Sequence, residues 1–491
     1  MRLVRAHVVM RHGDRTPVFN CWEPFATAAE ESWAWARKLP SRGAVARLEN
    51  GFAIEHDDAS SSSSTAGVAK DAAMGVYGSL TRRGLMQTSA VGKALRERLF
   101  YPEIETHGSV KASDVFVYSS NFDRTKRSAA SAVRAFIDEE ETERVRMRVV
   151  EGAADHINVY PHIPALRRRM QSIIADPGND TGIQRAEMAM APLRMSLQAY
   201  IPAFSMFIAP FSWINAADHF TCRQVRSGGS EYAVDPLSLF GDADADGNGE
   251  ICLEELRAVV DGVCEPPISD DDMKRMHDSV SNGKGAIRFE EFADFVKRPL
   301  PPIPEADLDK ISEAAAECIA SIDDGIDPEF HAGVSNKAAV GATVAHLCRR
   351  FHAWYRDETI LHYAVGKLAG IVASDFAQDK TIHPKFVFHS GHDVTVSPFV
   401  AALKSNGWDP SAGDVWPGYA SAVLVELLED DDGAKRYVRA SYFDGYHLGA
   451  ADGDVDFVPI SMKGEIDVGG TTAVPANEFC ARLDALANLE L

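Results

Sequence analysis

An apolar segment close to the start of the chain, Leu3 to Met10, constrains the fold more than any other feature. When this segment is extended, apolar side chains fall on both of its faces, which is typical of a strand buried on both sides in a parallel sheet. Two further short apolar strands are expected at Val115–Tyr118 and Phe386–Phe388, with helical patterns between them. Strands that alternate with helices predict an α/β sandwich.

Further helices and two late strands complete this prediction. Thr81 can cap a helix that continues to Leu99, because its hydroxyl can accept a hydrogen bond from a free amide of the first turn. Other helical patterns cover 124–137, 160–225, 305–381 and 394–404, and strands are expected at 419–428 and 437–443. Residues 20–79 are expected to be irregular, and the serine run 60–64 predicts a flexible loop.

The first strand ends in the sequence RHGDRTP, residues 11–17. Ligands of open α/β sheets bind at the carboxyl ends of strands. The guanidinium groups of Arg11 and Arg15 suit phosphate oxygens, and two nearby cations disfavour protonation of His12. A neutral imidazole between phosphate-binding arginines can accept a phosphoryl group, so His12 is the candidate nucleophile.

The other two apolar strands also end in residues that handle charge. The third is followed by HSGHD, residues 389–393, in which His392 can contact phosphate. Asp393 can protonate a leaving oxygen and later activate water. Beyond the second strand, Arg124 is a third candidate phosphate ligand. Together the three strand ends predict a local positive pocket at one edge of the sheet.

Most other charged residues are interpreted as surface or structural positions. Asp14 could be an ion-pair partner of Arg11 or Arg15, and Arg127 and Arg134 are expected to be solvated helix positions. The histidines outside the two motifs are interpreted as surface residues: His7, His156, His162, His219, His346, His352 and His362.

The motif RHGDRTP resembles the RHGxRxP signature of the histidine acid phosphatases, and Gly391-His392-Asp393 is similar to the distal HD motif of that family. The segment LTRRG at 80–84, followed by Gln87 and Gly92, and the segment 120–129 also resemble the family. The resemblance covers the chain apart from about residues 228–300. It implies a phosphoglycerate-mutase-like α/β core sheet with a helical cap domain.

The resemblance also implies the roles of the site residues. It makes His12 the nucleophile and Asp393 the proton donor, with phosphate bound by Arg11, Arg15, Arg124 and His392. Within the family, Tyr160-Pro161, the sequence HDVT at 392–395 and the stretch 442–459 are similar to the lysophosphatidic acid phosphatase branch. Unlike secreted members, the chain shows no signal peptide and no cysteine pairs, which favours a cytoplasmic protein with reduced thiols.

An acidic insertion contains a second motif. Residues 244–255, DADGNGEICLEE, fit the calcium-binding loop of an EF-hand. The loop spacing makes Asp244, Asp246 and Asn248 side-chain ligands, Glu250 a backbone-carbonyl ligand and Glu255 a bidentate ligand. Calcium needs several hard oxygens around one point, and this spacing supplies them. The predicted cofactor is therefore Ca²⁺, bound in the insertion, while catalysis requires none.

A second copy of the loop, residues 280–291, is degenerate. Val280 and Lys284 stand where oxygen ligands are required, so this copy is not expected to bind calcium. Its expected role is structural, with Ile287 beside Ile251. Phe289, Phe292 and Phe295 are expected to form a shared core. Residues 235–298 are thus predicted to be an all-α EF-hand pair inserted into a phosphatase domain formed by 1–227 and 299–491.

Charge limits the partners of the protein. The formal net charge is −22, and residues 235–296 account for half of it, with 16 acidic and 5 basic residues. An acidic surface disfavours nucleic acid, and no apolar run is long enough to span a membrane. The expected partners are a small phosphate ester and calcium, and the sequence specifies no oligomeric state.

These observations predict a phosphate monoesterase that acts through a phosphohistidine and is modulated by calcium. An alternative is a calcium-binding regulatory protein whose phosphatase-like domain is inactive. A second alternative is a mutase of the same fold, although mutases resemble RHGE rather than the RHGDR found at 11–15.

Overall fold

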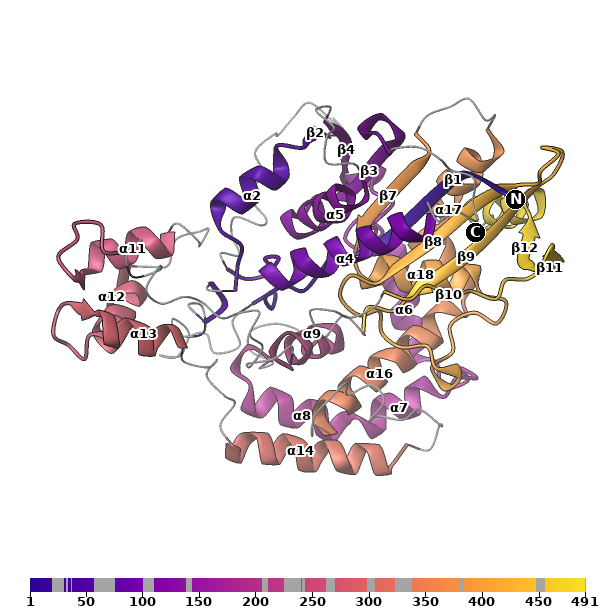
Figure 1. Cartoon of the computed structure of the whole chain (residues 1–491). Helices are drawn as coiled ribbons and strands as arrows, with labels where there is room; N and C mark the ends of the chain where they lie inside the picture. The colour runs from indigo at the N-terminus through magenta and orange to yellow at the C-terminus, as the bar shows by residue number, and fades with distance from the viewer. Residues whose placement is uncertain are drawn as a thin grey trace.

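The protein is described by a computed structural model that covers residues 1–19, 31, 34–36, 38–56, 76–99, 110–137, 144–204, 211–224, 240, 243–261, 270–297, 305–322, 338–378, 384–446 and 455–490. A mixed sheet forms its centre (Figure 1). Five strands run parallel, in the spatial order β2 (Phe52–His56), β4 (Val145–Val150), β3 (Val115–Ser120), β7 (Phe386–Gly391) and β1 (Arg2–Arg11).

The sheet continues with antiparallel strands beyond β1. They follow in the order β8 (Ala422–Glu429), β9 (Arg436–Phe443), β12 (Thr471–Pro475) and β11 (Ile466–Val468), and β10 (Val458–Pro459) also pairs with β9. The three strands expected at 3–10, 115–118 and 386–388 are confirmed as β1, β3 and β7. The sequence prediction did not include β2, β4, β10, β11 or β12.

Helices cover both faces of the sheet, which confirms the expected sandwich. One face is covered by α4 (Arg82–Leu99) and α5 (Asp123–Phe136), and the other by α17 (Glu358–Ala377), α18 (Asp393–Leu403) and α19 (Ala476–Ala487) (Figure 1). In β1, Val8 packs in one hydrophobic core and its neighbour Val9 in the other, and both are buried. This alternation confirms that β1 is buried on both faces.

A helical layer, here called the cap, packs beside the sheet. It consists of α6 (Pro164–Ala175), α7 (Ile183–Ala189), α8 (Ala191–Tyr200), α9 (Trp213–Gln224), α14 (Glu305–Ala320) and α16 (Ala338–Tyr355). Leu193, Trp213 and Ile311 join the core that also lies under α17 and α18. The cap is therefore packed continuously onto one side of the sheet.

The acidic segment forms a separate group of helices, α11 (Leu253–Asp261), α12 (Asp270–Val280) and α13 (Phe289–Lys297), which extends away from the sheet in Figure 1. Two short strands, β5 (Glu250–Ile251) and β6 (Ile287–Arg288), pair with Ile251 opposite Ile287, as expected. Phe292 and Phe295 are buried. Phe289 does not belong to this core, because it is 37% exposed.

Several other expectations need correction. Within 20–79, expected to be irregular, the structure has α2 (Arg42–Glu49), whose first turn is capped by Ser41, and β2. The serine run 60–64 lies outside the described residues. The strand expected from Tyr419 begins only at Ala422. The cysteines in the described part, Cys222, Cys252, Cys318, Cys348 and Cys480, are free thiols. None of the described helices is long and apolar enough to cross a membrane.

Candidate active site

Three neighbouring parallel strands bring the predicted site residues together. In the register of β1, β7 and β3, Arg11 lies opposite Gly391, and Ser390 lies opposite Ser119. The carboxyl ends of these strands therefore meet at one edge of the sheet. The residues assigned from the sequence are all buried there: Arg11, His12, Arg15, Arg124, His392 and Asp393.

His12 lies at the centre of this group. Its Nδ1 is 2.8 Å from the carbonyl oxygen of Gly13. A carbonyl oxygen only accepts, so Nδ1 carries the proton of this hydrogen bond and Nε2 of the neutral ring keeps its lone pair. Burial, together with the charges of Arg124, Arg15 and Arg11, holds the pKa of His12 well below its usual value. The structure therefore favours a neutral imidazole, as expected from the sequence.

Arg11 is held by two aromatic rings. Its guanidinium lies 4.8 Å from the ring centre of Trp416 and 4.4 Å from that of Tyr419, and Nη1 donates to the carbonyl of Pro417. Cation–π contacts of this kind restrict a guanidinium without neutralising its charge. The Nε–H groups of Arg11 and Arg15 have no hydrogen-bond partner among the described residues. Buried donors without partners are rare in proteins and fit a site that receives an anion.

Arg15 is held by an acid that the sequence did not reveal. Its Nη2 donates to Oδ1 of Asp218 at 2.7 Å, and Nη1 donates to the carbonyl of Thr16 at 2.9 Å. Burial opposes the charge of Arg15, but the attraction of Asp218, Tyr419 and other groups outweighs burial and raises its pKa. Asp218 lies in the middle of α9. No local motif marks it, so only packing of the cap identifies it.

Arg124 and His392 share an aromatic neighbour. The guanidinium of Arg124 lies 4.1 Å from the ring centre of Phe122, and the His392 ring meets the same ring edge to face at 5.2 Å. Nε2 of His392 is 3.0 Å from Oγ of Ser120, and its ring centre is 5.5 Å from that of His12. Burial and the charges of the three arginines lower the pKa of His392 well below its usual value. The structure therefore favours a neutral His392 ring, as it does for His12.

Both carboxylate oxygens of Asp393 accept hydrogen bonds. Nε1 of Trp416 donates to Oδ2 at 2.5 Å, and the amide of Val394 donates to Oδ1 at 2.9 Å. Asp393 is the first residue of α18, where free amide groups favour a negative charge. Trp416 therefore contacts both Asp393 and Arg11, a role that sequence reasoning missed.

The start of α4 supports the loop that carries His12. A Cβ atom on Gly13 would lie 2.3 Å from the carbonyl oxygen of Gly84, so only glycine permits this approach. The hydroxyl of Thr81 donates a hydrogen bond to Oδ2 of Asp14 at 2.5 Å. The backbone amide of Asp14 donates to Oε1 of Gln87 at 2.8 Å. The ion-pair acid of Arg15 is thus Asp218, whereas the carboxylate of Asp14 ties the loop to α4.

Four histidines that were interpreted as surface residues are buried: His7, His156, His219 and His346. Nδ1 of His7 is 3.0 Å from Nε2 of His389, and Nε2 of His7 is 2.8 Å from Oδ2 of Asp375. His156 contacts the other nitrogen of His389 at 3.3 Å. For His7, His156 and His346 sequence reasoning failed because each ring finds a polar partner on a distant segment, which reduces the cost of its burial.

The predicted calcium loop offers a compact set of oxygens. One carboxylate oxygen each from Asp244, Asp246 and Glu255 lies within 4.8 Å of the others. Gly249, at the sharp turn of the loop, has φ of 82°. The side chain of Glu250 turns toward Arg288, with Oε1 3.2 Å from Nε, which leaves the carbonyl of Glu250 as its candidate ligand. Hard oxygen donors in this arrangement fit Ca²⁺.

Further contacts concern the calcium prediction. Nδ2 of Asn248 donates to Oδ2 of Asp246 at 2.8 Å, and Oδ1 of Asn248 accepts from the amide of Glu250 at 2.7 Å, so the Asn248 side chain lies against a carboxylate of the loop. In the degenerate copy, Nζ of Lys284 is 2.9 Å from Oε1 of Glu291. An ammonium group therefore pairs with the acid at the last position of the second loop.

Comparisons with known proteins agree with this geometry. The sequence model of the family described as "Histidine phosphatase superfamily (branch 2)" matches residues 2–168. No curated protein matches the chain. Among solved structures, the phytase of Klebsiella sp. ASR1 is similar with a TM-score of 0.52 and 12% identity, over 99% of this chain and 95% of that chain. This similarity shows a shared fold.

Two further solved structures have lower scores. The Hafnia alvei phytase in complex with myo-inositol hexakis sulphate has a TM-score of 0.48 and 13% identity, over 99% of this chain and 98% of that chain. The Bifidobacterium longum multiple inositol polyphosphate phosphatase has a TM-score of 0.43 and 14% identity, over 99% and 92%. The match to the family model is confined to residues 2–168, and the similarity to the Klebsiella phytase shows a shared fold.

Proposed function

We propose that the protein hydrolyses phosphate monoesters through a phosphohistidine formed on His12. One observation carries this proposal: three buried arginines surround a buried histidine whose Nδ1 is bonded to the Gly13 carbonyl, so that Nε2 is left as a nucleophile. The arginines supply the positive charge that a phosphoryl group requires, and the proposal assigns no catalytic step to a metal.

The reaction proceeds in two displacements. Nε2 of His12 attacks phosphorus, a P–N bond forms, and the P–O bond to the leaving group breaks in line with it. Asp393 gives its proton to the leaving oxygen, since expulsion of an unprotonated alkoxide is slow. Asp393 then takes a proton from water, which attacks phosphorus and breaks the P–N bond. His12 is returned neutral, and inorganic phosphate leaves.

The surrounding side chains orient the phosphoryl group. Arg11, Arg15, Arg124 and His392 hold its equatorial oxygens through N–H donors. The carboxyl group of Asp393 serves as the acid for the leaving oxygen. Trp416 restrains the same carboxyl group through the hydrogen bond from Nε1 to Oδ2.

A generic aryl phosphate tests the class of reaction. We expect turnover by the native protein, none by His12→Ala, and full turnover by His162→Ala, a matched change at an exposed histidine. Acid-labile, base-stable phosphate should be trapped on the native protein during turnover, as expected for a phosphohistidine. Phosphate release by folded His12→Ala would contradict the nucleophilic role.

The substrate class is proposed more narrowly from sequence likeness to the lysophosphatidic acid phosphatase branch. A panel of a lysophospholipid, inositol phosphates, sugar phosphates and phosphopeptides decides it, read as kcat/KM for each. The lysophosphatidic acid proposal predicts the highest value for the lysophospholipid, and a higher value for another class would replace it. A cytoplasmic location belongs to the same proposal.

Calcium binding by residues 244–255 is the second part of the proposal. The ligands are Asp244, Asp246, Asn248 and Glu255 through side chains and Glu250 through its carbonyl. The clustered carboxylates, the left-handed Gly249 and the paired strands β5 and β6 support this loop. The insertion, 235–298, would then be an EF-hand pair within a phosphatase domain of 1–227 and 299–491.

Packing offers a route by which calcium would modulate the enzyme. One hydrophobic cluster contains Ile251 beside the calcium loop, Trp35, Cys222 of α9 and Tyr419. Tyr419 contacts Arg11 through its ring, and its hydroxyl is 2.9 Å from Sγ of Cys222. A change in the insertion can thus reach a phosphate-binding arginine. The rival function, a calcium-binding protein with an inactive phosphatase-like domain, requires that folded protein turn over no phosphate ester at any pH.

A further inference from the structure

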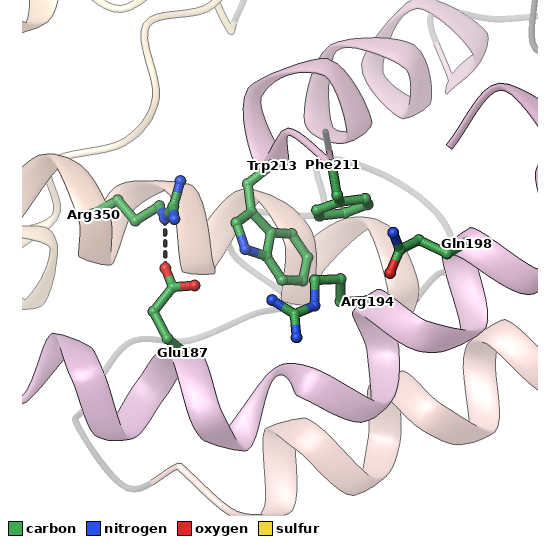
Figure 2. A pocket seen from close by; sticks show the side chains of 6 residues that line it. All are labelled: Glu187, Arg194, Gln198, Phe211, Trp213 and Arg350. Carbon is green, nitrogen blue, oxygen red and sulfur yellow. Dashed lines mark hydrogen bonds and ion pairs between the residues drawn. The ribbon is translucent and has the colours of Figure 1, made fainter. Parts of the chain in front are cut away.

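A cavity of about 320 Å³ lies within the cap, apart from the residues discussed so far. It is lined by Glu187 of α7, Arg194 and Gln198 of α8, Phe211, Trp213 of α9 and Arg350 of α16 (Figure 2). Its volume is within the range of small-molecule sites, which begins at about 300 Å³. Its lining combines charge, an amide and two aromatic rings.

The charges of the cavity do not cancel. Oε1 of Glu187 accepts from Nε2 of His346 at 3.0 Å and from Nε of Arg350 at 2.5 Å. Burial would raise the pKa of Glu187, but these two partners lower it to about 2, so the carboxylate is ionised and already used. Arg194 has no ion-pair partner among the described residues. Two arginines against one glutamate leave a net charge of +1.

The aromatic rings form the other part of the wall. Phe211 and Trp213 meet edge to face, with ring centres 4.9 Å apart and planes at 87°. In the view of Figure 2 the Arg194 guanidinium lies below the two rings, and Gln198 lies to the side of Phe211. A flat apolar group between rings and a guanidinium gains dispersion, desolvation and stacking energy. The unpaired charge selects for an anion.

The cavity is separate from the catalytic group, although both adjoin α9. Trp213 and Asp218 are five residues apart on this helix, which corresponds to about 140° around its axis and about 7.5 Å along it. Asp218 faces Arg15, whereas Trp213 faces His346 of α16, with ring centres 4.7 Å apart. The helix therefore stands between the cavity and the phosphate-binding arginines.

We propose that this cavity binds a small organic anion with a flat apolar body, such as an aryl sulfonate or an aryl phosphate, as a second site. The anionic group pairs with Arg194 and hydrogen-bonds to Gln198, and the flat body packs on Phe211 and Trp213. The site goes beyond the proposed hydrolysis at His12, because none of its residues contacts that histidine.

A chain of aromatic contacts connects the cavity to the loop that carries His12. The ring centre of Phe211 is 5.9 Å from that of Phe204, which is 5.8 Å from that of Phe19. Phe19 follows Arg15 by four residues. Trp213 provides a second route, through α9 to Asp218 and Arg15. A ligand that shifts these rings changes how Arg15 is held, so it changes KM at the catalytic site.

Calorimetric titration of the full chain with naphthalene-1-sulfonate tests the binding site. We expect binding that weakens about tenfold or more in Arg194→Ala, because a charge-assisted contact is lost. Phe211→Ala should weaken it through the loss of stacking. Arg168→Ala, a change at an exposed cap arginine outside the cavity, is the matched control and should leave affinity unchanged. Arg194 is exposed, so its removal should preserve the melting temperature.

Arg124→Ala distinguishes the two anion sites. Affinity for the sulfonate should survive this change, since Arg124 lies at the catalytic site. Loss of binding in Arg124→Ala, unchanged binding in Arg194→Ala, or no binding by the native protein would overturn the proposal.

Steady-state kinetics with an alkyl phosphate substrate, which has no flat apolar body for the cavity, test the coupling. The sulfonate should change KM for the native protein and not for Arg194→Ala, whose KM without the probe should equal that of the native protein. An equal KM with and without the probe would overturn the coupling. The titration needs no turnover, so it decides the binding site even where the proposed hydrolysis fails.

Discussion

Arg15 of the loop after β1 and Asp218 of α9 form a buried ion pair, with Nη2 2.7 Å from Oδ1, which joins the loop that carries His12 to the cap. Asp218→Asn keeps the size of the side chain and removes its charge. We expect KM for phosphate esters to rise about tenfold with a smaller change in kcat, because Arg15 loses its orientation but not its charge.

The control for this prediction is Glu317→Gln, at an exposed acid of α14. Asp218 acts as a positioning residue, so Asp218→Glu should recover part of the lost affinity. A loss of kcat with unchanged KM in Asp218→Asn would argue against this positioning role.

Asp393→Asn tests the proton donor by comparing leaving groups. An alkyl phosphate needs a proton on its leaving oxygen, so kcat should fall about 100-fold or more. A nitrophenyl phosphate leaves without that proton, so formation of the phosphohistidine should slow much less. Burst kinetics separate the two steps. Equal losses for both substrates in the first step would exclude Asp393 as the general acid.

Buried neutral histidines should make stability depend on pH. Burial, with the neighbouring cations and rings, lowers the pKa of His12, His389 and His392 well below the usual value and that of His156 to about 4. The unfolded chain binds protons at these rings below about pH 6.5, and the folded protein does not. The contribution of these neutral rings to the free energy of unfolding should therefore be complete above about pH 6.5 and decrease as the pH falls below it.

Urea unfolding between pH 7 and pH 4.5 measures this dependence. His156→Gln should reduce the slope by up to about 1.4 kcal/mol per pH unit, since one proton fewer is taken up on unfolding. His162→Gln, at an exposed histidine, is the control. A native protein whose stability rises as the pH falls over this range would contradict the buried neutral rings.

Calcium should stabilise the insertion through Glu255. Saturating Ca²⁺ is expected to raise the melting temperature, because an ion that binds only the folded state adds its binding free energy. Glu255→Gln should abolish the shift, whereas Glu291→Gln, at the equivalent position of the degenerate loop, should retain it. Aryl phosphate turnover with calcium and with chelator measures modulation. Equal rates and equal melting temperatures would leave the insertion without a calcium function.

Gly84→Ala should destabilise the catalytic loop. A Cβ atom at this position would lie 2.2 Å from the carbonyl oxygen of Asp14, a backbone atom that cannot move away alone. We expect a loss of about 1–3 kcal/mol, as for other overpacked sites, together with reduced turnover. Gly370→Ala, on α17, is a milder control, since its Cβ would meet only the Cβ of Ala487 at 3.1 Å. Equal effects of the two changes would argue against the backbone contact.

Parallel strand order explains why so much of the candidate site could be predicted. His12, Arg124 and His392 each follow an apolar strand within a few residues, and β1, β7 and β3 are neighbours in the sheet. A strand that is buried on both faces can be recognised from its own apolar residues, without knowledge of which strands pair with it. The calcium loop could also be predicted, because its candidate ligands lie within twelve consecutive residues.

Long-range contacts could not be predicted in the same way. Asp218 lies 203 residues from Arg15, and Trp416 lies 23 residues beyond Asp393 in an irregular segment. His7 and His156 looked like surface residues because the partner of each, His389, lies on a strand that is distant in the sequence. The strands at the two edges of the sheet were missed, since they are short or partly exposed.

The sequence by itself determined the α/β class, the three charged strand ends and the calcium-loop spacing, because each is encoded by residues close together along the chain. The tertiary structure decided which acid holds Arg15, which aromatic rings hold Arg11 and Asp393, and where the cap leaves a charged cavity. Those choices depend on how distant helices pack against the sheet edge, and packing of this kind has no local signature.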